Sequence, residues 1–287
     1  MPNGVEQPAN SLTVMDVVVV VSGVALFAWW LLSTSLGRES LANSKPRRNC
    51  MTPFTPILLF MVWLLGGGLL LSAAYHMAGN AEPWRKAFWG QLASSLGSLG
   101  TAVIVLILAK LDFARGLKGL GLRLKTAPKD LGFACLTLLA VWPLVLAAMR
   151  LTVLVTRLLY GQEYRIPQHE ALKLITEYPA VPLQVILVIM AMVVAPVVEE
   201  MLFRGLFQTT IRSYSGRPWL AIGLTSVLFA LIHADKTHWP SLFALALGLG
   251  YAYEKSGSLL RPIFMHALFN GISIVAVLTQ GPGGIQS

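Results

Sequence analysis

Long apolar runs dominate this sequence and restrict the folds that it can adopt. Five of them are long enough to cross a bilayer as helices, since a hydrocarbon core of ~30 Å takes about 20 residues. These runs are Val14–Leu36, Phe54–Tyr75, Phe88–Ala109, Leu131–Val155 and the stretch from Val181 through Glu200. A helix keeps its backbone hydrogen bonds within the segment, as lipid requires. The sequence therefore predicts an all-α fold, a polytopic helical membrane bundle.

Three later apolar runs are shorter or carry polar groups. They are Trp219–His233, Ser241–Tyr253 and Pro262–Leu278. With them the expected total is about eight transmembrane helices, and seven spans or a re-entrant loop is the alternative. Residues 1–180 hold about four N-terminal spans and their loops. Residues 181–287 hold the later spans and the candidate functional residues, and we expect them to pack with the first part as one membrane domain.

Composition supports the membrane assignment and excludes one class of partner. Of the 287 residues, 55% are hydrophobic and 12% are charged, whereas a soluble domain has about 25% charged residues. The net charge of +9 would suit nucleic acid. The Lys and Arg residues lie in short loops between apolar runs, however, where they set membrane orientation. We therefore expect a lipid bilayer around the chain and no nucleic-acid partner.

Two loops hold most of the basic residues in the first half of the chain. Basic loops stay on the cytoplasmic side, so we expect an extracytoplasmic N-terminus in a multi-pass protein of the plasma, or bacterial inner, membrane. The second loop alternates Leu and Gly with basic residues, which suits a segment on an anionic membrane surface or a plain topology-setting loop. The basic residues are Arg38, Lys45, Arg47 and Arg48 in the first loop and Lys110, Arg115, Lys118, Arg123, Lys125 and Lys129 in the second.

The N-terminus and the cysteines carry two smaller indications. Residues 1–37 contain no Lys or Arg. The first apolar run therefore lacks the basic region of a cleavable signal peptide, and we expect it to stay in the mature protein. The two cysteines, Cys50 and Cys135, predict neither a disulfide framework nor a thiolate metal site.

Two adjacent carboxylates, Glu199 and Glu200, stand at the end of the fifth apolar run. A charge at the bilayer centre costs ~2.5–3.5 kcal/mol, so charged residues within spans indicate function. On a helix, Glu200 and Arg204 lie four residues apart on one face and can form an ion pair, while Glu199 points away from that pair. We therefore expect Arg204 to hold Glu200 and to leave Glu199 available for chemistry.

Two histidines lie in later apolar runs, each with a companion four residues away. Phe229 precedes His233, and Asn270 follows His266, so that each pair shares one helix face. Each pair also has a structural explanation. A single His at the end of an apolar run is commonly an interfacial residue, and His266 with Asn270 would equally suit a hydrogen bond between helices.

Together these side chains suit hydrolysis. A carboxylate can act as a general base on water, and an imidazole can orient that water and move its proton. An imidazole and a carboxamide can donate hydrogen bonds to a developing oxyanion. Two His and a Glu are also the protein ligands of some catalytic zinc sites, although the HExxH spacing of zinc proteases is absent. A metal site and the proton relay of a transporter therefore remain alternatives.

The three groups of residues also follow a known series of motifs. EEMLFR at 199–204, FALIH at 229–233 and HALFN at 266–270 match the patterns EExxxR, FxxxH and HxxxN in that order. In this respect the sequence resembles the CPBP family of intramembrane proteases, whose eukaryotic members are the type II CaaX prenyl endopeptidases. The resemblance spans roughly residues 181–278, about a third of the chain.

The resemblance implies an intramembrane, glutamate-dependent endopeptidase that cleaves a membrane-associated protein or peptide, prenylated CaaX proteins among the candidates. It implies that Glu199 with His233 activates the attacking water and that His266 and Asn270 form the oxyanion site. The supporting residues would be Glu200, Arg204 and Phe229. No cofactor is expected, with a zinc-dependent metalloprotease left open. The other alternative is a non-catalytic member of the same fold that binds a peptide or partner in an immunity-type role. Neither the natural substrate nor the oligomeric state follows from the sequence.

The depth of the two histidines is a difficulty for this assignment. If the sixth run enters the membrane near Pro218, His233 lies ~22 Å along it, whereas His266 lies only ~8 Å past Arg261. Straight parallel helices would keep the imidazoles apart. Tilted or offset spans, or a fifth helix that continues to about Ser213, would bring them to one depth.

Overall fold

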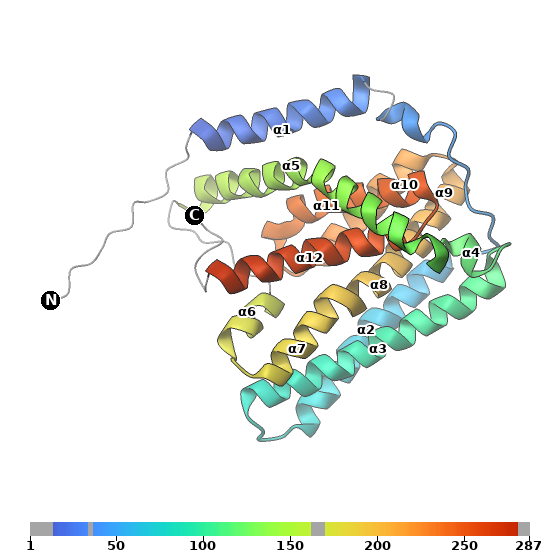
Figure 1. The fold of residues 1–287 in the computed structure, drawn as a ribbon. Coiled ribbons are helices and arrows are strands. Elements are labelled where there is room, and N and C mark those ends of the chain that lie inside the picture. Colours follow the sequence, from blue (N-terminus) through green and yellow to red (C-terminus); the bar gives the residue numbers. More distant parts are fainter. Residues whose placement is uncertain (1–13, 34–36, 162–169, 281–287) are drawn as a thin grey trace.

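The computed structural model describes residues 14–33, 37–161 and 170–280 as a helical bundle (Figure 1). Within these ranges, each of the predicted apolar runs corresponds to a helix. The main helices are α1 (Val14–Ser33), α2 (Phe54–Met77), α3 (Pro83–Asp112), α5 (Ala127–Tyr160), α7 (Val181–Ile189), α8 (Ala195–Glu200), α9 (Thr209–Ser215), α10 (Pro218–Leu231), α11 (Trp239–Ser256) and α12 (Leu260–Gln280). The short helices are α4 (Leu117–Leu120) and α6 (Glu170–Glu177).

Five segments of the described chain are long and apolar enough to cross a membrane. They are Phe54–Met77, Pro83–Asp112, Leu117–Tyr160, Val181–Ser215 and Leu260–Thr279. Helix α10 is apolar but shorter. The protein is thus a helical membrane bundle, as the sequence predicts, whereas the total of eight crossings stays a prediction.

Two helices extend further than the apolar runs that predict them. Helix α3 begins at Pro83, before Phe88, and α5 begins at Ala127, before Leu131. The apolar run marks only the part of a helix that lies in hydrocarbon, while backbone hydrogen bonding continues into the polar flanks. Proline within the first turn of both helices fits this extension, because that position needs no backbone N–H.

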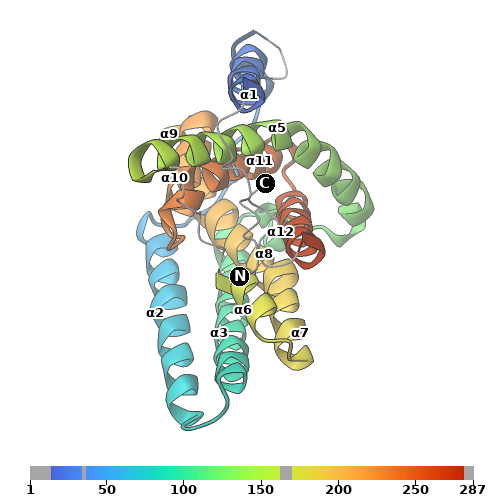
Figure 2. The same cartoon turned by 90° about the vertical axis from the view of Figure 1, so that its left-hand side faces the viewer.

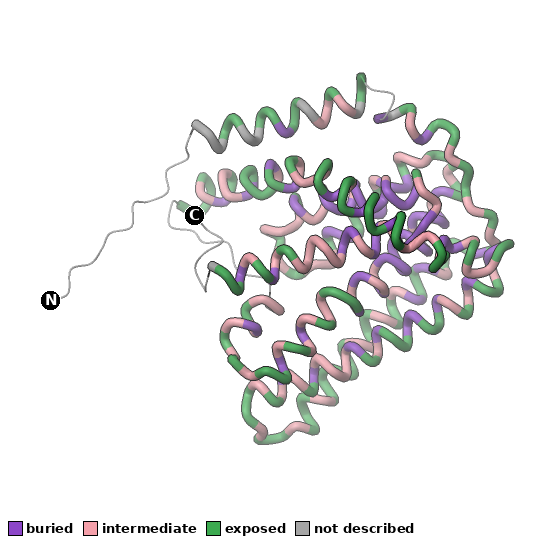
Figure 3. The backbone as a smooth tube through the Cα atoms, viewed as in Figure 1, coloured by how far each residue is buried: buried purple, intermediate pink, exposed green. Residues whose placement is uncertain are grey.

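The helices form successive layers across the bundle. Helix α1 lies at one edge and packs on α5, which in turn packs on α11 and α12 (Figures 1 and 2). Helix α12 contacts α8, and the α2–α3 hairpin lies at the opposite edge from α1. Buried residues gather around α8 to α11, whereas α2 is largely exposed along its length (Figure 3). Its exposed side chains are apolar, for example Leu58 and Leu69, as expected for a surface that faces lipid.

Small residues allow two of these helix pairs to approach closely. A Cβ atom added to Gly90 on α3 would lie 2.4 Å from the ring of Tyr75 on α2. A Cβ atom at Gly248 on α11 would lie 2.6 Å from the side chain of Val141 on α5. Membrane helices commonly use small residues for such close packing. Helices α2 and α3, and helices α5 and α11, therefore depend on glycine at their contacts.

The two basic loops lie at the same end of the bundle. The backbone N–H of Cys50 in the first loop donates to the carbonyl of Asp112 at the start of the second, at 2.9 Å. The N–H of Leu259, between α11 and α12, donates to Gly121 O of the second loop at 3.0 Å. This arrangement is compatible with both loops lying on one side of a membrane. The orientation of the N-terminus stays a prediction.

Candidate active site

The two glutamates lie on a continuous helix with an irregular backbone. Helices α7, α8 and α9 join through two π-helical stretches, Met190–Val194 and Met201–Gln208. Pro196 has no backbone N–H, and the N–H of Ala195 donates to Met190 O, five residues back. π-Helical turns occur frequently at functional sites. The fifth span thus continues to Ser215, which agrees with the longer of the alternatives for this helix.

Glu200 and Arg204 form the ion pair that their spacing predicts. Arg204 Nη1 lies 2.8 Å from Glu200 Oε1, and both residues are fully buried. The Arg204 Nη2 group donates to the carbonyl of Ala246 on α11 at 3.1 Å. The guanidinium carbon also lies 4.7 Å from the centre of the Phe229 ring on α10, within the range of a cation–π interaction. Arg204 therefore connects α8 to both α10 and α11.

His266 on α12 contacts both glutamates. Its Nδ1 lies 3.0 Å from Glu200 Oε1, and its Nε2 lies 4.0 Å from Glu199 Oε2. Because an ionised carboxylate only accepts hydrogen bonds, Nδ1 carries the hydrogen and Nε2 is the atom on the side of Glu199. Glu199 Oε2 is buried and has no hydrogen-bond partner among the described residues. Glu200 Oε2 is likewise buried and without a partner in the described chain, so the site contains one unsatisfied oxygen on each glutamate.

Phe229 packs against both imidazoles. Its ring centre lies 5.1 Å from that of His233 and 5.6 Å from that of His266. Helix α10 ends at Leu231, so His233 lies in the turn beyond the helix rather than at its last position. The His233 ring is held by a contact of 2.8 Å between its Nδ1 and the carbonyl of Phe229. The two imidazoles thus share one aromatic neighbour, whereas straight parallel spans would keep them apart.

The resemblance assigns water activation to Glu199 with His233, but the contact recorded for Glu199 is with His266. The catalytic roles of all these residues stay predictions. What the structure establishes is proximity. Two glutamates from α8, a histidine from α12 and the Phe229–His233 pair from the end of α10 converge in one place.

Asn270 lies one turn after His266 and satisfies the irregular helix. Its Nδ2 donates to the carbonyl of Ala191 at 2.7 Å. No backbone N–H in the next turn is available to this carbonyl. Ala195, four residues on, donates to Met190 O instead, and Pro196, five residues on, has no N–H. The side chain of Asn270 therefore replaces a backbone donor that the π-helical turn does not supply.

Gln208 belongs to the same supporting structure and was not expected from the motifs. Its Nε2 donates to Gly250 O at 3.0 Å, one turn along α11 from the Arg204–Ala246 bond. A Cβ atom at Gly250 would lie 2.9 Å from Gln208 Oε1, so glycine at this position leaves room for the Gln208 side chain. Two polar side chains four residues apart thus bind two carbonyls four residues apart. The spacing of Arg204 and Gln208 within an apolar run was the available signal.

The described residues do not form an evident metal site. No group of three or more His, Cys, Asp or Glu side chains in the described ranges is arranged to hold a metal ion. Glu200 accepts hydrogen bonds from Arg204 and His266. Metal dependence stays a question for experiment.

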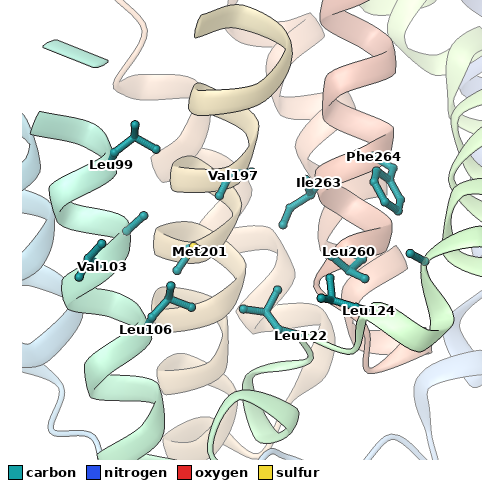
Figure 4. A pocket seen from close by; sticks show the side chains of 12 residues that line it. Leu99, Val103, Leu106, Leu122, Leu124, Val197, Met201, Leu260, Ile263 and Phe264 are labelled. Carbon is teal, nitrogen blue, oxygen red and sulfur yellow. The ribbon is translucent and has the colours of Figure 1, made fainter. Parts of the chain in front are cut away.

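An apolar cavity of about 500 Å³ lies between α3, α8 and α12 (Figure 4). Val197 on α8 and Ile263 on α12 contribute to its wall, within one helical turn of Glu199 and His266 respectively. Leu122 and Leu124 of the second basic loop form one end of it (Figure 4). The other lining residues are Leu99, Ala102, Val103, Leu106, Ala127, Met201, Leu260 and Phe264. Every lining side chain is apolar.

Comparison with known proteins gives matches in the motif-bearing region. Among curated proteins, "Putative membrane peptidase YdiL" of Bacillus subtilis (strain 168) is 29% identical over 100 residues, which are 34% of this chain and 39% of that relative. The "Uncharacterized 24.3 kDa protein" of Escherichia coli is 29% identical over 112 residues, 38% of this chain and 52% of the relative. The chain thus spans no more than about half the length of these relatives. No solved structure matches the chain.

A family model covers the same region. Residues 181–272, which include all three motifs, match the family described as type II CAAX prenyl endopeptidase Rce1-like. The resemblance predicted from the motifs is therefore confirmed, and residues 181–272 of this helical membrane protein carry the sequence pattern of the type II CAAX prenyl endopeptidase Rce1-like family.

Proposed function

We propose that this protein is an intramembrane endopeptidase that hydrolyses a peptide bond of a membrane-associated protein or peptide, with Glu199 as the general base. The Rce1-like match and the relative named as a membrane peptidase support the peptidase class. The observation that carries the proposal is Glu199 Oε2, a buried acceptor with no hydrogen-bond partner in the described chain, beside the imidazole of His266. Such an oxygen suits a water molecule that awaits activation.

In this mechanism Glu199 takes a proton from the attacking water. A positioned base of this kind contributes ~10²–10⁴-fold to the rate. His233 assists by orienting the same water. Its Nδ1 faces the carbonyl of Phe229, which only accepts, so in the neutral ring the hydrogen is on Nδ1 and Nε2 is an acceptor. This arrangement fixes both the tautomer and the plane of the ring.

His266 and Asn270 would stabilise the negative oxygen of the tetrahedral intermediate. This role requires a hydrogen on His266 Nε2 in addition to the Nδ1 hydrogen that faces Glu200. The Asn270 amide has two N–H groups, and the carbonyl of Ala191 uses one of them. Loss of one such oxyanion donor costs ~10²–10³-fold in rate.

Glu200 and Arg204 would act by positioning. Glu200 Oε1 receives hydrogen bonds from both Arg204 and His266. It therefore fixes the ring orientation of His266, while Arg204 compensates its charge. In this proposal the two adjacent glutamates have different roles: Glu200 positions His266, and Glu199 is the general base.

For the substrate, we propose a protein or peptide that approaches from the bilayer, with prenylated CaaX-type tails as the first candidates. The description of the matching family supports this choice. Unprenylated membrane-anchored peptides are the comparison class. Both classes would present a scissile bond to a site that lies within a helical membrane bundle.

The test is cleavage of prenylated and unprenylated fluorogenic peptides by the purified protein in lipid, with and without a metal chelator. We expect cleavage by the wild type, loss of at least ~100-fold in Glu199→Gln, and no effect of the chelator. Loss on chelation would instead establish the zinc-dependent alternative. If neither form cleaves any peptide yet both bind one equally, the protein is a non-catalytic binder and the proposal is wrong.

A further inference from the structure

The apolar cavity opens toward the surroundings of the protein rather than into the bundle. Among its lining side chains, Leu99 is 44% exposed, Val103 is 54% exposed and Leu124 is 81% exposed. In a membrane these side chains would face hydrocarbon. A volume of about 500 Å³ lies within the ~300–1,000 Å³ of ordinary ligand pockets. The cavity therefore suits a chain-like apolar ligand that enters sideways from the bilayer.

The end of the cavity formed by the second basic loop is positively charged. The exposed residues Arg123 and Lys125 alternate along the chain with the lining residues Leu122 and Leu124. Neither basic side chain forms an ion pair with another described residue. Lys129, also exposed, follows one turn into α5. An apolar cavity with cationic groups at one end matches a ligand with an apolar chain and an anionic head.

The basic end of the cavity is held in place by the rest of the fold. Tyr253 Oη donates to Leu120 O at 2.8 Å, and Leu259 N donates to Gly121 O at 3.0 Å. On the other side of the loop, the buried carboxylate of Asp130 accepts from Ser258 Oγ at 2.6 Å. These bonds attach the loop to the α11–α12 connection. The loop that carries Arg123 and Lys125 is therefore held to the rest of the fold by hydrogen bonds.

We propose that this cavity binds one acyl chain of an anionic phospholipid, whose phosphate lies against Arg123 and Lys125. The lipid would come from the leaflet on the side of the basic loops, where basic segments attract anionic headgroups. Val197 and Ile263 line the cavity and belong to the helices that carry Glu199 and His266. The bound chain therefore packs against the same two helices as the candidate site. The binding itself does not depend on the proposed peptidase activity.

The test measures which lipid the purified protein retains from vesicles of phosphatidylcholine and phosphatidylglycerol in equal amounts. We expect the wild type to enrich phosphatidylglycerol. Arg123→Gln/Lys125→Gln should lower that enrichment about 30-fold, given a contribution of about 1 kcal/mol from each basic residue at an anionic surface. The matched control is Lys45→Gln/Arg48→Gln, which removes two exposed basic residues from the first loop and should leave enrichment unchanged.

A second measurement places the acyl chain. Phosphatidylglycerol with a photoreactive group in its chain should label α3 and α12, and Val103→Trp, which narrows the open side of the cavity, should reduce that labelling. Equal retention of both lipids, or equal losses in the two double variants, would overturn the proposal. So would labelling of the cavity by a prenylated peptide but not by the lipid, which would assign the cavity to the substrate.

Discussion

At the scale of single residues, His266 links the parts of the candidate site. One ring nitrogen lies 3.0 Å from Glu200 and the other lies 4.0 Å from Glu199, while the ring centre lies 5.6 Å from that of Phe229. The two adjacent glutamates thereby acquire different surroundings. Glu200 Oε1 accepts from Arg204 and His266, whereas Glu200 Oε2 and Glu199 Oε2 are buried and without a hydrogen bond in the described chain.

The buried ion pair gives a prediction about stability. Arg204→Gln should lower the free energy of unfolding by ~3–5 kcal/mol, because it leaves the carboxylate of Glu200 buried without compensation. The double variant Glu200→Gln/Arg204→Gln should lose clearly less, since no uncompensated charge remains. Chemical unfolding in detergent micelles measures both variants. Equal losses in the single and double variants would show that the charge of Glu200 is compensated by another group.

At the scale of elements, the continuous helix from α7 to α9 determines where the functional side chains lie. In its π-helical turn before Pro196, the carbonyl of Ala191 accepts a hydrogen bond from the side chain of Asn270 in place of a backbone N–H. On the other side of the glutamates, Arg204 and Gln208 bind two carbonyls of α11. The irregular helix is thus attached to α11 and to α12 by side-chain hydrogen bonds.

This arrangement predicts that Asn270 and Pro196 are energetically coupled. Asn270→Ala should cost ~1–3 kcal/mol of stability, because it leaves the part-buried carbonyl of Ala191 without its donor. In a Pro196→Ala background the cost should be smaller, since the new backbone N–H lets the helix satisfy that carbonyl itself. A double-mutant cycle by thermal or chemical unfolding measures the coupling. Strictly additive losses would contradict the capping role of Asn270.

The helices and the Glu200–Arg204 pair could be predicted from the sequence because both follow from local rules. Apolar length identifies spans, and a spacing of four residues places two side chains on one helix face. The π-helical turns could not be predicted, since the choice between four- and five-residue hydrogen bonding depends on tertiary partners such as Asn270. Nor could the contact of His266 with both glutamates, which depends on how α12 packs against α8.

At the scale of the whole molecule, the first basic loop, the second basic loop and the connection between α11 and α12 lie together at one end of the bundle. Besides the backbone bonds of the two basic loops, Arg212 at the end of the long helix pairs with Glu254 at the end of α11, with 3.1 Å between Nε and Oε1. The Arg47 guanidinium of the first loop lies 3.6 Å from the ring centre of Tyr253. Most of the chain's loop-borne basic residues are therefore gathered on one side. The number of basic residues in each loop predicts that they lie on one side. The contacts of Arg212 with Glu254 and of Arg47 with Tyr253 could not be predicted in this way, because they depend on how the helices pack.

The predicted topology can be tested with cysteine labelling. Cys50 lies exposed in the first basic loop, so a membrane-impermeant maleimide should label it only after cells are permeabilised. The experiment uses Cys135→Ala, which leaves one thiol. As the matched control, Asn80→Cys in a cysteine-free chain lies exposed between α2 and α3 and should be labelled in intact cells. Labelling of Cys50 in intact cells would reverse the orientation.

The most direct test of the central claim compares initial rates of peptide cleavage by the wild type, Glu199→Gln and Glu82→Gln in the same lipid. Glu82 is an exposed carboxylate between α2 and α3, so its replacement controls for the loss of one charge. We predict that Glu82→Gln cleaves at the wild-type rate and that Glu199→Gln, folded to the same extent, is at least ~100-fold slower. Cleavage by Glu199→Gln at the wild-type rate would contradict the account.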